Sequence, residues 1–244
     1  MKIFKRILLG LLVVIALSVL GFIVWAETPL GPAPEALSAL ESDSQVIVTI
    51  NDFITFQPAN LQPTTGFIFY PGGHVDYRSY AVPLRAIAEQ GYFVVLVPVR
   101  LNLAFFDINA ADSVFSLYPE IQHWATGGHS LGGVASALFA KDHPEIEGLI
   151  FWASYPADDF FKSSKIKVIS IYGTNDMAGT QVFEDKRSLL PVDTQYVVID
   201  GGNHGQFGNY GPQPGDNQAT ISSAEQQKQI VEASVNFLRE VSNP

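Results

Sequence analysis

Cysteine is absent from the 244 residues. Its absence excludes disulfide bonds, cysteine-ligated zinc and a cysteine nucleophile. A protein outside the cytoplasm can fold without disulfides when its hydrophobic core is large enough. With 47% hydrophobic and 16% charged residues, the composition is typical of a globular protein and excludes a disordered one.

Basic residues are also scarce. The chain has 14 Lys and Arg against 24 Asp and Glu, and its formal net charge is −10. Lys2, Lys5 and Arg6 all precede the first acidic residue, Glu27, so only 11 of the 14 basic residues remain to balance the 24 acidic ones. An acidic domain repels phosphate backbones, so we expect no nucleic acid partner.

One long segment, residues 7–25 (ILLGLLVVIALSVLGFIVW), contains no charge. At about 1.5 Å per residue, a helix of this length spans roughly 28 Å, which is close to the thickness of a bilayer's hydrocarbon core. Because the three basic residues precede the segment and Glu27 follows it, the positive-inside rule predicts a cytoplasmic N-terminus and an extracytoplasmic domain. The membrane is therefore an expected partner.

Residues 1–26 have two main interpretations, a retained single-pass anchor and a cleaved signal peptide. The anchor is favoured because the apolar run is longer than the usual apolar region (h-region) of a signal peptide, which is about 7–15 residues. A signal peptide would be cleaved before Glu27, with Val24 and Ala26 as the small residues, and the protein would be secreted. A buried core helix is the third interpretation. Residues 27–39 contain three prolines and predict a linker, and residues 40–244 predict one domain.

After residue 40, short apolar segments alternate with segments of helical periodicity. Residues 45–50 and 53–57 predict a β-hairpin. Further strands are predicted at residues 66–70, 92–97, 124–128, 149–153, 167–172 and 195–199. Helices are predicted at residues 79–90, 131–141, 183–190 and 222–241. This alternation predicts an α/β fold with a mostly parallel central sheet, helices on both faces and little or no cap domain.

A candidate nucleophile lies between a predicted strand and a predicted helix. Gly128-His129-Ser130-Leu131-Gly132 is a G-x-S-x-G sequence. In a tight strand-to-helix turn, Gly128 and Gly132 avoid clashes while the Ser130 hydroxyl is exposed at the carboxyl edge of the sheet. The helix N-terminus favours negative charge that develops there.

The GGHSLGG segment, residues 127–133, resembles the nucleophile elbow of the α/β-hydrolase superfamily, particularly of bacterial esterases and dienelactone-hydrolase-like members. The resemblance extends from about residue 45 to the C-terminus. The chain departs from dienelactone hydrolases at the nucleophile, which is Cys in those enzymes and Ser130 here. The resemblance implies a serine hydrolase that needs no metal or organic cofactor.

In this fold the acid and the histidine follow the serine in that order. Asp176, in the Y-G-T-x-D sequence after a late strand, resembles the family's acid, with Asp158, Asp159 and, more weakly, Asp185 as rivals. His204 follows the last predicted strand between glycines and is the predicted base. The other histidines have ordinary structural explanations: His123, His129 and His143.

The predicted oxyanion hole combines the backbone N–H groups of Leu131 and Gly73, with Gly72 and His74 as neighbouring alternatives for the second donor. His74, Phe207 and Tyr210 are candidate pocket residues; the loop that carries the last two can equally be a surface loop that anchors the final helix. The expected activity is hydrolysis of a carboxylic ester or thioester of a small molecule. An acyltransferase with the same triad and a non-catalytic, membrane-tethered binding protein are the alternatives.

Overall fold

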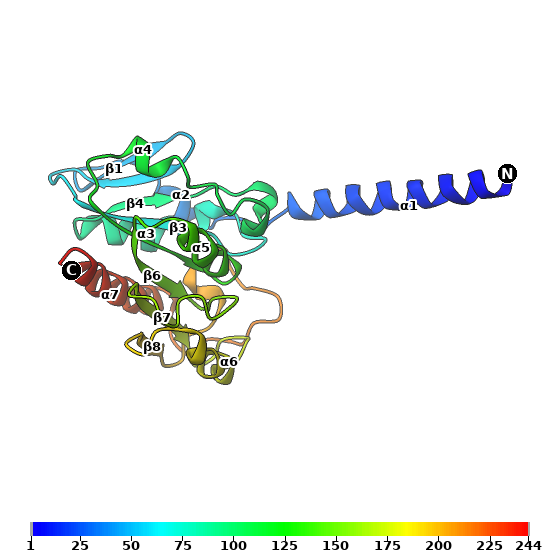
Figure 1. Ribbon diagram of the computed structural model, residues 1–244. Coiled ribbons are helices and arrows are strands. Elements are labelled where there is room, and N and C mark those ends of the chain that lie inside the picture. The colour runs from blue at the N-terminus through cyan, green and yellow to red at the C-terminus, as the bar shows by residue number, and fades with distance from the viewer. Residues whose placement is uncertain (1, 244) are drawn as a thin grey trace.

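The computed structural model describes residues 2–243, so residues 1 and 244, the ends of the predicted anchor and of the predicted domain, lie outside the described residues. A single long helix, α1 (Lys2–Ala26), projects from one side of a layered α/β domain (Figure 1). In the part of the chain that the structure describes, one helix is long and apolar enough to cross a membrane, and it covers Ile3–Ala26. Apart from Ala26, which is buried, all its apolar residues in the range 3–25 are exposed.

The domain is built on one sheet of eight strands in the order β1-β2-β4-β3-β5-β6-β7-β8. Strands β1 and β2 form the predicted antiparallel hairpin, and β2 also pairs antiparallel with β4. The other six strands, β4, β3, β5, β6, β7 and β8, run parallel to one another. The strands are β1 Val46–Ile50, β2 Ile54–Pro58, β3 Thr65–Tyr70, β4 Phe93–Leu96, β5 His123–His129, β6 Ile146–Trp152, β7 Lys167–Gly173 and β8 Gln195–Ile199. Because these six strands are parallel, their carboxyl ends share one edge.

Helices cover both faces of the sheet, as predicted. The α-helices of the domain are α2 Pro34–Ser38, α3 Ala81–Glu89, α4 Val114–Leu117, α5 Leu131–Asp142, α6 Thr180–Lys186 and α7 Ser223–Val241. Five 3₁₀ turns complete the structure: η1 Tyr77–Tyr80, η2 Arg100–Asn102, η3 Ala104–Phe106, η4 Arg187–Leu189 and η5 Gly205–Phe207. Helices α3 and α7 pack on one face, while α4 and α5 pack on the other.

Strand β3 shows how the sheet separates two cores. Phe67 and Phe69 belong to the core beneath α3 and α7, whereas Ile68 and Tyr70 belong to the core beneath α5. Alternate residues of a strand point to opposite faces, so a strand between two helix layers must be apolar throughout. All six residues of β3 are buried.

The segment between α1 and the domain differs from the free linker that its prolines predict. Leu30 forms a parallel β-bridge with Val75, and Ala36 in α2 is fully buried. The backbone N–H of Ala33 donates a hydrogen bond to the carbonyl of Asn209. Residues 27–39 therefore lie along the domain surface, because their small apolar side chains pack against it.

Candidate active site

Ser130 lies in the strained turn that joins β5 to α5. Its φ of 52° is in the left-handed region, which is uncommon for a residue other than glycine. A Cβ at Gly128 would approach the Tyr70 carbonyl oxygen at 2.5 Å, and one at Gly132 would approach the Pro71 carbonyl oxygen at 2.2 Å. Because these neighbours are backbone atoms that cannot move aside, the turn requires glycine at both positions.

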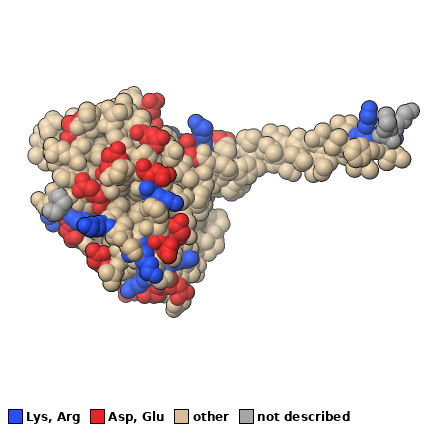
Figure 2. Space-filling model, viewed as in Figure 1, with Lys and Arg blue, Asp and Glu red and all other residues tan. Residues whose placement is uncertain are grey.

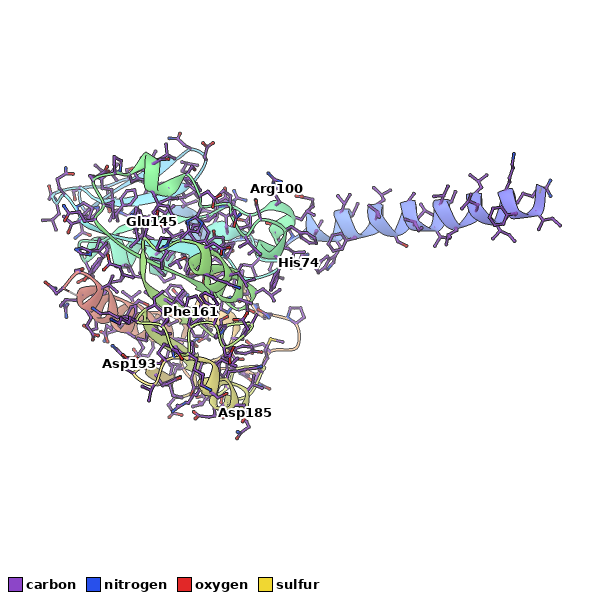
Figure 3. All side chains as sticks on the ribbon, viewed as in Figure 1. His74, Arg100, Glu145, Phe161, Asp185 and Asp193 are labelled. Atoms are coloured by element: carbon purple, nitrogen blue, oxygen red, sulfur yellow. The ribbon has the colours of Figure 1, made fainter. Side chains whose placement is uncertain are left out.

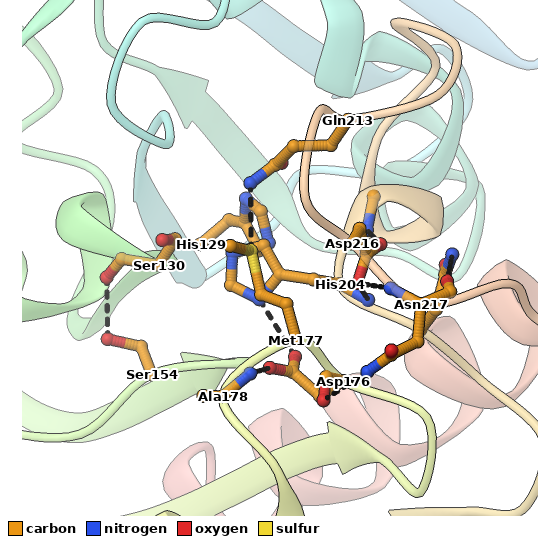
Figure 4. Close-up of polar contacts among 12 residues, drawn as sticks. His129, Ser130, Ser154, Asp176, Met177, Ala178, His204, Gln213, Asp216 and Asn217 are labelled. Atoms are coloured by element: carbon orange, nitrogen blue, oxygen red, sulfur yellow. Dashed lines mark hydrogen bonds and ion pairs between the residues drawn. The ribbon is translucent and has the colours of Figure 1, made fainter.

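His204 and Asp176 form a buried pair at the carboxyl edge. His204 Nδ1 lies 2.8 Å from Asp176 Oδ2, and the two residues are 6% and 1% exposed (Figure 4). Asp176 follows β7 and His204 follows β8, and these strands are neighbours in the sheet. The other oxygen of Asp176, Oδ1, accepts a hydrogen bond from the backbone N–H of Ala178 at 2.8 Å, which fixes the carboxylate.

The loop that carries His204 is held by two side chains that the sequence analysis did not identify. Asp216 accepts hydrogen bonds from the backbone N–H groups of His204 at 3.3 Å and of Gly205 at 2.7 Å. Gln226 of α7 accepts from the N–H of Asn203 and donates to its carbonyl. Gln226 lies 23 residues after Asn203, and no local sequence pattern links the two residues, so only the fold reveals this contact.

Ser130 and His204 face a common cavity of about 380 Å³. It is lined by Gly73, Ser130, Leu131, Val134, Ala153, Ser154, Tyr155, Met177, Ala178, Phe183, His204 and Gln213. Within residues 2–243, no hydrogen bond joins the Ser130 side chain to His204; the serine carbonyl accepts one from the Ser154 hydroxyl at 2.6 Å. The structure therefore brings Ser130 and His204 to one cavity, with Asp176 bound to His204 outside the cavity lining, and leaves the serine hydroxyl unpaired with the histidine.

The rival acidic residues lie elsewhere. Asp158 and Asp159 are on an exposed loop, where Asp158 accepts a hydrogen bond from the backbone N–H of Phe160. Asp185 is exposed on α6 and accepts a hydrogen bond from Gln181. Of Asp158, Asp159, Asp185 and Asp176, only Asp176 contacts His204 in the described part of the chain.

The glycine loop after β3 has one N–H group that the fold does not engage. The Gly72 N–H donates to the Tyr80 hydroxyl at 3.1 Å, and the His74 N–H donates to the Asn102 carbonyl at 2.8 Å. Gly73, between them, lines the cavity, and no acceptor for its N–H occurs among residues 2–243. On the other side, Leu131 begins α5, and the first N–H groups of a helix have no acceptor within it.

A buried polar network lies behind the pair. His129 Nδ1 is 2.9 Å from the Tyr80 hydroxyl, and its ring centroid is 4.5 Å from that of His204. Burial lowers the pKa of His129 well below its ordinary value, and the neighbouring His204 ring lowers it further. Burial also raises the pKa of Tyr80. The His129 ring and the Tyr80 hydroxyl are therefore neutral near pH 7. Together they connect the Gly72 N–H of the glycine loop to the His204 ring, which packs against His129.

The structure corrects the candidate pocket residues. Phe207 is fully buried and stacks on His129 with ring centroids 5.4 Å apart, and Tyr210 packs 6.2 Å from Tyr80. Neither lines the cavity, because both rings fill the space behind the His129 side chain. His74 also points away from the cavity and stacks on Trp25. The apolar cavity wall comes instead from side chains such as Met177 and Phe183.

A strained nucleophile turn before a helix, an acid–histidine pair on later strands and a mostly parallel sheet define the class of proteins with an α/β-hydrolase fold. Residues 66–228 match the family described as the alpha/beta hydrolase family, and the match covers more than half of the chain. The chain belongs to this family. No curated protein matches the sequence significantly.

Solved structures show the same fold at low sequence identity. A dienelactone hydrolase from Anabaena variabilis is 14% identical, with a TM-score of 0.61, and the match covers 81% of this chain and 99% of that one. The esterase domain of a Rhodothermus marinus protein is 15% identical, with a TM-score of 0.60 and coverages of 80% and 97%. Carboxyl esterase 2 of the fungus Tuber melanosporum is 12% identical, with a TM-score of 0.60 and coverages of 87% and 91%. These likenesses establish the fold.

Proposed function

We propose that this protein hydrolyses carboxylic esters through an acyl-enzyme formed on Ser130. The observation that carries the proposal is the buried His204–Asp176 contact of 2.8 Å, which lies at the cavity that also contains Ser130. The family match and the esterases among the solved structures support the reaction class.

In the proposed reaction His204 Nε2 takes the proton of the Ser130 hydroxyl as the serine oxygen attacks the ester carbonyl. Asp176 accepts the Nδ1–H, keeps the imidazole in the required tautomer and stabilises its charged form. The alcohol leaves with the proton from His204. Water then attacks the acyl-enzyme with His204 as base, and the carboxylic acid departs. A thioester follows the same steps with a thiol as leaving group.

The negative charge of the tetrahedral intermediate is assigned to the N–H groups of Leu131 and Gly73. Gly73 is favoured over Gly72 and His74 because the N–H groups of those two already have acceptors in the fold. Removal of one such donor typically costs about 100- to 1000-fold in turnover.

The Ser130 hydroxyl must rotate toward His204 before it can transfer its proton. A free site often has long or poorly aligned catalytic hydrogen bonds that form only with bound substrate. Both residues line the same cavity, which supports a rotation of the serine side chain as the step that brings the hydroxyl to His204 Nε2.

A fluorophosphonate probe, which reacts with activated serines, tests the proposal. Wild type and the matched control Ser188→Ala, an exposed serine on η4, should be labelled. Ser130→Ala should not be labelled, and it should also lose hydrolysis of 4-methylumbelliferyl butyrate. If folded wild type neither reacts with the probe nor cleaves the ester, the protein is not a serine hydrolase, and the non-catalytic alternative gains support. Cleavage that yields mainly the new ester when a low concentration of alcohol is added would favour the acyltransferase.

We also propose that residues 1–26 are retained as a membrane anchor and that the domain lies outside the cytoplasm. Support comes from the end of α1, where the Ala26 residue is fully buried against the domain. Cleavage before Glu27 would remove this residue and leave the surface that covers it exposed. The orientation rests on the basic residues that precede the apolar segment.

A further inference from the structure

The domain binds the end of the long helix through specific side chains. His74 Nε2 donates to the Trp25 carbonyl at 2.7 Å, and Asn102 Nδ2 donates to the Ala26 carbonyl at 3.0 Å. The rings of Trp25 and His74 stack with centroids 4.2 Å apart. The last carbonyls of a helix lack partners within it, so these contacts cap α1 with groups of the domain. His74 lies at the base of the helix in Figure 3.

The backbone at this contact is strained. His74, Leu101 and Asn102 have φ values of 58°, 56° and 51°, although none of them is glycine. Such conformations persist only where surrounding contacts hold them, and they concentrate at functional positions. Here the His74 N–H donates to the Asn102 carbonyl, and the Leu30 N–H donates to the His74 carbonyl. The end of α1 is therefore held by a segment of the domain whose own backbone is fixed by hydrogen bonds.

This surface continues directly into the active site. His74 follows Gly73, the proposed oxyanion donor. The Leu131 side chain lies against Gly73, since a Cβ there would come within 2.5 Å of Leu131 Cδ1. Leu131 in turn follows Ser130. The end of α1 and the nucleophile are therefore separated by one short chain of contacting residues.

Exposed apolar side chains lie near the base of α1 and at the cavity. Phe106 is 56% exposed and its ring lies 6.0 Å from that of Phe22 in α1, while Phe105 is 44% exposed. At the cavity, Leu131 and Met177 are 40% and 43% exposed. We call these four residues, Phe105, Phe106, Leu131 and Met177, the apolar rim.

The figures place the anchor and the cavity edge on one side. In Figure 1, α1 leaves the domain on the side where the loops that follow the parallel strands lie, including the loop after β8. In Figure 2, the Lys and Arg side chains on the projecting helix lie only at its far end, and charged side chains otherwise gather over the body of the domain. With α1 across a bilayer, Phe106 comes close to the membrane surface, because its ring lies against Phe22 of that helix.

We propose that the cavity opens toward the bilayer and that the substrate is an ester whose acyl chain resides in the membrane. This inference rests on the proposed hydrolase function and on the retained anchor. The contacts between the end of α1 and the domain restrict how far the domain can turn relative to the bilayer. The acyl chain enters past Leu131 and Met177, and water completes the reaction, so that a long-chain acid and an alcohol are released.

The test uses the full chain reconstituted in vesicles of ether-linked phosphatidylcholine, which contain no ester of their own. Two fluorogenic esters are compared, 4-methylumbelliferyl oleate within the bilayer and 4-methylumbelliferyl acetate in solution. The measured quantity is the ratio of the oleate rate to the acetate rate. Phe105→Ser/Phe106→Ser should lower this ratio by about tenfold, which corresponds to loss of part of the burial of two rings.

The matched control is Leu61→Ser/Val192→Ser. These two apolar residues are 60% and 103% exposed and precede β3 and β8, at the opposite edge of the sheet. The control should keep the wild-type ratio. If the phenylalanine variant does not fold, Trp25→Ala, which removes the ring stacked on His74, should lower the ratio in the same direction.

Equal ratios in the phenylalanine variant and the control would overturn the inference, and so would a wild type that cleaves acetate but not oleate. Either result leaves the proposed hydrolase intact. Failure of the hydrolase itself has a different signature, because wild type would then cleave neither ester and would not react with the fluorophosphonate probe.

Discussion

Backbone strain is concentrated at a few residues around the cavity and the anchor. Within residues 2–243, the residues other than glycine that have positive φ are His74, Leu101, Asn102, Ser130 and Ala153. Ser130 and Ala153 line the cavity, and the other three form the surface that binds α1. Residues in these regions cost energy that the remaining contacts must offset, so their distribution marks where precise placement matters most.

Asp176→Asn tests the acid at the residue scale. The amide cannot stabilise a charged imidazole and favours the wrong tautomer, so kcat for 4-methylumbelliferyl butyrate should fall by about 10⁴-fold, as the equivalent change does in a serine protease. The unfolding midpoint in urea should change little because the side chain keeps its shape. Asp158→Asn is the control and should retain wild-type kcat; a large loss there, with Asp176→Asn still active, would move the acid to the preceding strand.

The sequence predicts the residues that meet at the site but not those that support them. Ser130, Asp176 and His204 each stand in a short local pattern after a strand, so parallel topology alone brings them to one edge. Their catalytic roles stay a prediction. Tyr80 and Asp216 act through contacts between distant segments, and no local pattern marks them. The position of Phe207 after His204 in a glycine-rich loop suggests a pocket residue, but the sequence does not tell which way a loop side chain turns, and the ring is buried outside the cavity lining.

At the scale of elements, the junction of β5 and α5 depends on close backbone approach. The carbonyl of Pro71 occupies the space where a side chain at Gly132 would lie. The helix can therefore approach the sheet closely enough to present Ser130 at its N-terminus. This arrangement explains why small residues dominate the first turn of α5.

Gly132→Ala should destabilise the domain by about 3 kcal/mol, because the added methyl would lie 2.2 Å from a backbone oxygen and overpacking of this kind forces the chain apart. Urea denaturation monitored by tryptophan fluorescence measures the change in unfolding free energy. Gly31→Ala is the matched control, since a Cβ at Gly31 meets nothing within 4 Å and should leave stability unchanged. Similar stabilities of the two variants would show that the turn can relax.

Most helices and strands can be predicted from the hydrophobic pattern of the sequence, and the segments that cannot be predicted have a physical reason. Strands such as β3 and β4 are buried on both faces, which makes them continuous apolar runs that are easily recognised. Residues 101–119 form only short turns and α4, so their aromatic residues give no clear period. The prolines of residues 27–39 predict a linker. The sequence does not reveal that the segment packs on the domain, because this packing depends on single small residues such as Ala36 and not on a repeated pattern.

At the scale of the whole molecule, the anchor and the domain share an interface. The domain's side chains cap α1 and cover Ala26, so a mature chain without residues 1–26 would lose part of its own surface contacts. This arrangement supports the proposed retention of residues 1–26, while the apolar helix itself is compatible with a membrane anchor or a signal peptide.

The intact chain recovered from membranes should have a mass of 26.6 kDa, as measured by mass spectrometry. The control is Val24→Phe, an exposed position of α1 at which a bulky residue blocks signal cleavage before Glu27. Its mass should differ from wild type only by the substitution. A wild type that lacks residues 1–26, together with an uncleaved Val24→Phe variant, would show that the segment is a signal peptide.

The hydrogen bonds between the Gln226 side chain and the Asn203 backbone make the position of the loop that carries His204 depend on α7. Helix α7 follows all eight strands of the sheet along the chain, so it can dock only after the sheet has been synthesised. Until α7 docks, the loop that carries His204 lacks the hydrogen bonds that Gln226 supplies, so we expect the His204–Asp176 contact to become fixed only when folding is complete.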